Sequence, residues 1–166
     1  MATEKLLEWS DSYKVGIQEV DEQHKELVGM LNALHQAIVE HHAKEASRRI
    51  LDQLADYTRT HFLLEESLMR VTHYPGFEAH KQQHEELIRQ VVELQHKLDT
   101  GGATITFELL HFLKIWLAQH INETDKRFGA FFNQNSNLKA YSSWSEEVTT
   151  TMKKKAFAIL TLCISL

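Results

Sequence analysis

The chain has 166 residues, of which 43% are hydrophobic and 25% charged, enough for one ordinary domain with a real core. Its 18 Lys and Arg against 23 Asp and Glu give a formal net charge of -5, so no basic field is present to hold nucleic acid. The single cysteine, Cys163, excludes an intrachain disulfide and a thiolate metal cluster, and fits a reducing compartment. Because the N-terminus shows no export signal, we expect a cytoplasmic protein.

Apolar residues recur at spacings of three and four along four segments, which is the pattern of amphipathic helices. The strongest breakers, Pro75 in HYPGF and the glycines of DTGGAT, fall between these segments. We therefore predict helices at about 20–41, 45–72, 77–98 and 106–132. Short connections favour antiparallel neighbours, so the predicted fold is an all-α, up-down-up-down four-helix bundle over residues 1–132.

Two segments flank the predicted bundle. Residues 1–19 form an irregular arm, and we expect its Trp9, Val15 and Ile17 to pack across the helices. Residues 133–166 are a polar linker followed by a short apolar tail. As a helix, the last eleven residues would be only about 16 Å long, too short to cross a hydrocarbon core of about 30 Å. We expect the tail to pack on the bundle, with weak membrane or partner attachment as the alternative.

Eleven histidines in a chain with one cysteine indicate a metal site of nitrogen and oxygen ligands. In THFLLEESLM, His61 and Glu65 are four residues apart and share a helix face, whereas Glu66 points elsewhere. An isolated pair of this kind is more often part of a solvated face. The same spacing occurs in AHKQQHEEL, and the first and fourth helices add residues of DEQHKELV and HINETD, so the full candidate set is His24, His61, Glu65, His80, His84, His120 and Asp125.

The levels of these residues along the bundle agree with one another. His24 lies near the start of the first helix, His61 late in the second, His80 early in the third and His120 late in the fourth, so antiparallel alternation places all four at one end. His96 and His111 point away from the other histidines of their own helices and are predicted to lie on the surface.

Five imidazoles and two carboxylates exceed the four ligands of a tetrahedral zinc ion, so we predict two metal ions. If both carboxylates bridge and the ions share one oxygen atom, eleven of the twelve positions around two octahedral ions are filled. The remaining position would let a small molecule bind directly to a metal.

The ordered set His, HxxxE, HxxxH and HxxxxD resembles the hemerythrin family in its single-domain bacterial form. The similarity extends from Trp9 to about Phe132, and the HFxxEE motif and the WSDSYKVGI arm also look like the bacterial members. The resemblance implies two iron ions. One would be held by His80, His84 and His120, the other by His24 and His61, with Glu65 and Asp125 as bridges and the open position on the second iron.

What the resemblance implies is reversible dioxygen binding, for storage, transport or delivery to oxygen-requiring enzymes, rather than catalysis. The alternatives are a di-iron oxidoreductase and a sensor of dioxygen, nitric oxide or redox state at the same position. The oligomeric state stays open. Apolar residues beside the candidate ligands are the predicted walls of an oxygen pocket, although such residues are core by default: Leu27, Phe62, Trp116 and Leu117.

The stretch HINETD carries one residue too many for a regular helix. His120 and Asp125 are five positions apart, which turns the side-chain direction by about 140° in an α-helix. If both residues serve one centre, the helix must widen between Ile121 and Asp125, and we predict a π-type bulge there.

Overall fold

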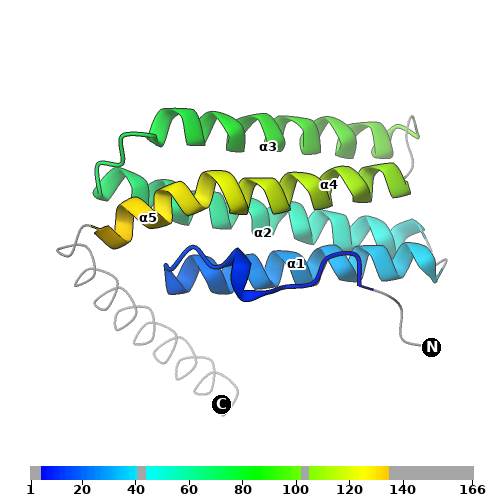
Figure 1. Ribbon diagram of the computed structural model, residues 1–166. Coiled ribbons are helices and arrows are strands. Elements are labelled where there is room, and N and C mark those ends of the chain that lie inside the picture. Colours follow the sequence, from blue (N-terminus) through cyan, green and yellow to red (C-terminus); the bar gives the residue numbers. More distant parts are fainter. Residues whose placement is uncertain (1–4, 41–43, 102–104, 135–166) are drawn as a thin grey trace, which may run out of the picture.

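Four antiparallel helical segments form a bundle (Figure 1). The computed structural model describes residues 5–40, 44–101 and 105–134. Its helices are α1 (Gln18–Val39), α2 (Lys44–Val71), α3 (Phe77–Asp99), α4 (Phe107–Gln119) and α5 (Lys126–Gln134), with a π-helical segment between the last two. No strand occurs within the described ranges. The predicted all-α bundle is confirmed, and the helix ends lie close to the predicted ones.

The turn between α2 and α3 brings the end of one helix beside the start of the next. His73 adopts a left-handed φ of 52°. Its N–H donates to the carbonyl of Arg70 at 3.1 Å, and the N–H of Tyr74 donates to that of Met69 at 2.9 Å, which is the Schellman arrangement of helix ends. Pro75 follows and cannot continue a helix. This tight reversal sets the last turns of α2 against the first turns of α3.

The N-terminal arm runs along α1 and meets α5 (Figure 1). The N–H of Val15 donates to the carboxylate of Asp21 at 2.7 Å, and the amide of Asn133 donates to the Val15 carbonyl at 3.4 Å. Val15 and Ile17 are buried in the core, as predicted, whereas Trp9 is half-buried. These bonds and contacts fix the arm to both helices.

The buried apolar side chains form three clusters, and a polar layer lies between two of them. Along α1, Val20 belongs to one cluster and Leu27 to the other, with His24 between them. Along α2, Leu54 and Met69 belong to opposite clusters and enclose a similar buried polar stretch. The polar layer therefore crosses the core of the bundle and does not lie on its surface.

None of the described helices is both long and apolar enough to cross a membrane. The predicted linker and apolar tail, from residue 135 onwards, lie outside the described residues.

Candidate metal centre

The structure brings all seven candidate ligands together in the polar layer, and each is at most 5% exposed. Their possible ligand atoms form two sets, each with all atoms within 4.8 Å of one another. Both carboxylates belong to both sets. We call the imidazoles of the first set the three-histidine group (His80, His84 and His120) and those of the second the two-histidine group (His24 and His61).

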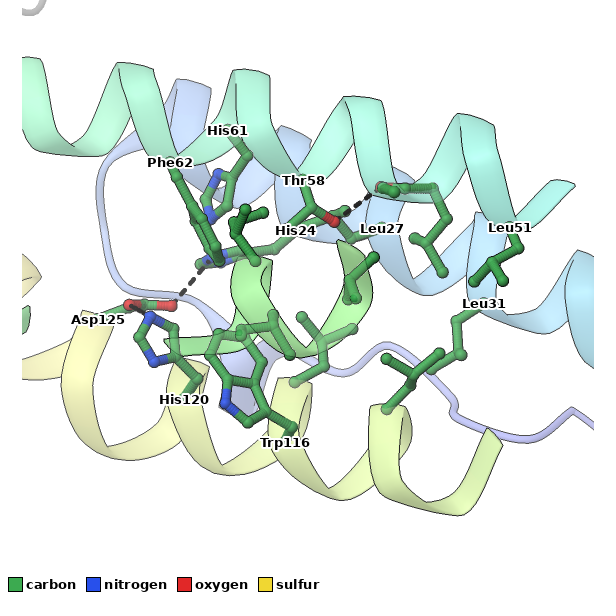
Figure 2. Close-up of a pocket in the computed structure, with 17 residues that line it drawn as sticks. His24, Leu27, Leu31, Leu51, Thr58, His61, Phe62, Trp116, His120 and Asp125 are labelled. Carbon is green, nitrogen blue, oxygen red and sulfur yellow. Dashed lines mark hydrogen bonds and ion pairs between the residues drawn. The ribbon is translucent and has the colours of Figure 1, made fainter. Parts of the chain in front are cut away.

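The two carboxylate oxygens of Asp125 face different groups. Oδ1 lies 3.1 Å from Nε2 of His80 and 3.0 Å from Nε2 of His120. Oδ2 lies 3.2 Å from Nε2 of His24, the contact drawn as a dashed line in Figure 2. Glu65 approaches through Oε2, at 3.3 Å from His80 Nε2 and 3.9 Å from His61 Nε2. Asp125 is thus placed to offer one oxygen to each of two ions.

A π-helical segment at His120–Asp125 gives Asp125 this position. Because a π-helix bonds each residue to the fifth along, five residues make about one turn and stack on one face. His120, Ile121, Thr124 and Asp125 are all buried, while Asn122 and Glu123 are exposed. The predicted widening of the fourth helix is confirmed, and it resolves the five-residue spacing of HINETD.

Hydrogen bonds from neighbouring side chains orient three of the imidazoles. Nδ1 of His84 lies 3.2 Å from Oε1 of Glu66, and a carboxylate can only accept, so Nδ1 carries the hydrogen. Amide oxygens take the same role for the other two rings, with Gln23 at 3.0 Å from Nδ1 of His61 and Gln83 at 3.2 Å from Nδ1 of His120. The lone pair of each ring is therefore on Nε2 and faces the centre of the layer.

This arrangement fits metal ions better than it fits an empty core. Nε2 of His84 and Nε2 of His120 lie 3.0 Å apart, and in the neutral rings both are acceptors, so a cation that accepts both lone pairs would make the contact favourable. The side-chain nitrogens of His24 and His80 and the oxygens of Glu65 and Asp125 are buried without a hydrogen bond, which is costly unless another partner is present. Adjacent donors at about 2.1 Å from an octahedral ion are about 3 Å apart, close to the spacings observed.

The charges of the site also suit divalent cations. Burial and the charge of Asp125 raise the pKa of Glu65, but His80 and its neighbours bring it to about 2. Burial also raises the pKa of Asp125, yet His120 holds it well below its usual value. Burial lowers the pKa of His61 to about 3. Burial also acts to lower the pKa of His80, but the two carboxylates outweigh this effect and raise the pKa of His80 to about 9. Two buried anions and the neutral imidazole of His61 are in the protonation states that metal binding requires, and an ion would displace the proton of His80.

Aromatic rings stack on the faces of two imidazoles of the three-histidine group. Phe62 stacks on His84 with centroids 3.6 Å apart and planes at 5°. Trp116 stacks on His120 at 4.4 Å and 13°. Together with the hydrogen bonds at Nδ1, these stacks fix the planes of both rings.

An apolar cavity extends from His24, His61 and His120 along the bundle (Figure 2). Leu31 and Leu51 line its far part. About 40 Å³ of this cavity is open to the centre of a water-sized molecule. On the same measure, one such molecule needs about 10–15 Å³. The four predicted pocket walls all line it, namely Leu27, Phe62, Trp116 and Leu117; their role toward dioxygen stays a prediction.

The sequence did not reveal the outer partners of the imidazoles. Glu66 points away from the centre, as predicted, but it reaches across to His84 on α3. Gln23 and Gln83 each precede a candidate ligand directly, yet each contacts an imidazole on a different helix. The only signal in the sequence was a polar residue next to a candidate ligand, and it did not indicate which imidazole that residue contacts. His96 and His111 are exposed, as predicted.

Comparison with known proteins agrees with this geometry. The family model described as "Hemerythrin HHE cation binding domain" matches residues 15–132. The bacteriohemerythrin of Stenotrophomonas maltophilia is 35% identical over 143 residues, which cover 84% of this chain and 92% of that protein. The myohemerythrin of Sipunculus nudus is 32% identical over 120 residues, covering 72% and 88%. A crystal structure of wild-type hemerythrin has a TM-score of 0.72 at 32% identity and covers 75% of this chain and 96% of its own. With a family model matched across the whole bundle and relatives of this identity, the chain belongs to the hemerythrin family.

Proposed function

We propose that the chain binds dioxygen reversibly at a di-iron centre, to store oxygen, transport it or deliver it to oxygen-requiring enzymes. The observation that carries this proposal is that the two groups differ in their number of possible protein donors. The three-histidine group has five possible protein donors and the two-histidine group has four, because both share Glu65 and Asp125. An open position is therefore expected at the two-histidine group. Both imidazoles of that group line the cavity, whereas the three-histidine group contributes only His120.

The family supports iron as the metal. When bound, two ferrous ions supply the electrons and the open coordination position that dioxygen binding needs. His24 and His61 would hold the ion at the open position, while Glu65 and Asp125 would hold both ions at a fixed separation. Neutral imidazoles outnumber carboxylates in this set, so the site carries less negative charge than centres rich in glutamate.

The lining of the cavity supports a carrier over an oxidoreductase. Its polar members among the described residues are candidate ligands and Thr58. The hydroxyl of Thr58 donates to the carbonyl of Leu54 at 2.8 Å, so it is not free to deliver a proton. The leucines and aromatic rings exclude water and ions but admit a small apolar molecule. Such surroundings protect a bound ligand from protons and reductants.

Anaerobic loading with ferrous iron tests the proposal. We expect two iron ions per chain, an optical spectrum that changes on exposure to air, and recovery of the ferrous spectrum under vacuum over several cycles. His61→Ala should lose this behaviour, because it removes one of the two imidazoles of the two-histidine group. His111→Ala, which removes an exposed histidine, is the matched control and should behave like the wild type. A single irreversible oxidation, or turnover with an added reductant, would contradict reversible binding.

A further inference from the structure

The outer partners of the candidate ligands differ in charge between the two groups. His84 of the three-histidine group donates to the carboxylate of Glu66, whereas His61 of the two-histidine group donates to the amide oxygen of Gln23. We propose that Glu66 is a positioning residue that places a negative charge behind the three-histidine group and lowers the reduction potential of the iron held there. This inference rests on the proposed di-iron function.

Glu66 reaches His84 because it lies next to a ligand on the same helix. Consecutive residues of a helix point about 100° apart, so Glu65 enters the core while Glu66 turns toward the groove between α2 and α3. The side chain of Glu66 is 13% exposed and that of His84 is 1% exposed. Phe62, one turn earlier on α2, covers the face of the same ring. The imidazole is thus held by a stack and by a charged hydrogen bond.

The negative charge of Glu66 is not shared with the cations of the same groove. Arg59 and Arg89 line that groove. Arg59 pairs with Asp56 at 2.7 Å, and Arg89 pairs with glutamates of its own helix, the nearest at 2.6 Å. The charge of Glu66 also contributes to raising the pKa of Lys81, but the ammonium of Lys81 is hydrogen-bonded to Glu85. The hydrogen bond of the Glu66 carboxylate is with the imidazole of His84.

A carboxylate at the outer nitrogen of a metal-bound imidazole makes that imidazole a more basic donor. A more basic donor stabilises the ferric ion more than the ferrous ion, so less free energy is gained when that iron takes up one electron. An amide oxygen orients the ring in the same way but adds no net charge. The structure thus places the charged partner behind the group with the larger number of donors, and the uncharged partner beside the expected open position.

Redox titration of the iron-loaded chain with mediators, together with Mössbauer spectra of ⁵⁷Fe samples, tests the proposal. Glu66→Gln keeps an acceptor at His84 and removes only the charge. Outer partners typically change metal affinity about 10-fold or more, and a tenfold change in the ferric-to-ferrous preference of one iron is about 59 mV. We expect the midpoint potential to rise by about that amount, with the spectral change confined to one of the two irons.

Glu85→Gln is the matched control, because Glu85 lines the same groove but its carboxylate pairs with Lys81, not with an imidazole. It should leave the potential unchanged. The double variant Glu66→Gln with Gln23→Glu keeps the net charge and moves the carboxylate behind His61, so the spectral change should move to the other iron.

Two results would overturn the inference while leaving the proposed function intact: an unchanged potential in Glu66→Gln with two irons bound, or an equal rise in Glu85→Gln. If Glu66→Gln does not fold, Gln83→Glu replaces it. That variant adds a carboxylate behind His120 and should lower the potential, so the absence of a shift there would also overturn the inference. A wild-type chain that binds fewer than two irons would instead overturn the proposed function itself.

Discussion

Replacing Gly129 with alanine should push the N-terminal arm away from α5 and destabilise the protein. A Cβ at Gly129 would lie 2.2 Å from the carbonyl oxygen of Val15 and 3.0 Å from its carbonyl carbon. Ordinary contact begins at 3.4 Å, so the arm must retreat by the difference, about 1.2 Å, at a residue that is only 7% exposed. Forcing a packed core apart in this way costs about 1–3 kcal/mol, while alanine regains about 1 kcal/mol of helix propensity. We expect a net loss of up to about 2 kcal/mol.

Urea unfolding followed by circular dichroism measures this loss, and the chain supplies a matched control. Gly29 is also within a helix, and a Cβ there would meet no atom within 4 Å. Gly29→Ala should therefore stabilise the protein by about 1 kcal/mol, so the same substitution should have opposite signs at the two sites. A Gly129→Ala protein stabilised as much as Gly29→Ala would show that the arm does not bear on α5.

Three further changes test the centre itself. Asp125→Asn removes the charge shared by both groups, so anaerobic loading should yield one iron or fewer per chain; two firmly bound ions would refute the shared role. In the metal-free chain, the pKa of His80 is about 9 against a usual 6.5. Its contribution to stability is therefore full below pH 6.5 and is lost as the pH rises through 9, with a loss on the order of 3 kcal/mol. Urea unfolding on both sides of this window should show the loss in the wild type and not in His80→Gln, whereas a flat wild-type profile would contradict it. Ala55→Leu adds bulk to the cavity and should slow oxygen uptake in stopped-flow measurements without changing the iron count; an unchanged rate would mean that oxygen arrives by another route.

The bundle could be predicted because its determinants are local. Apolar spacing fixes the inward face of each helix, and the breakers between helices fix their direction. Once the helices alternate, the level of His24 on the first helix and that of His120 on the fourth follow from their sequence positions. Even the π-helical segment could be predicted, because His120 and Asp125 can face one centre across five residues only if the helix widens.

Only the tertiary structure decided which side chains hydrogen-bond to the outer nitrogens of the candidate ligands and which space lies on their inner side. Glu66 contacts His84 across α2 and α3, and Gln83 contacts His120 across α3 and the π-helical segment. These pairs depend on how far each helix is rotated about its axis and on side-chain rotamers, which the packing of the whole core sets. The cavity has the same origin, since it is the space left where leucines of several helices fail to meet. Periodicity in the sequence gives the direction of a side chain within its own helix, and its partner on another helix follows only from the packing.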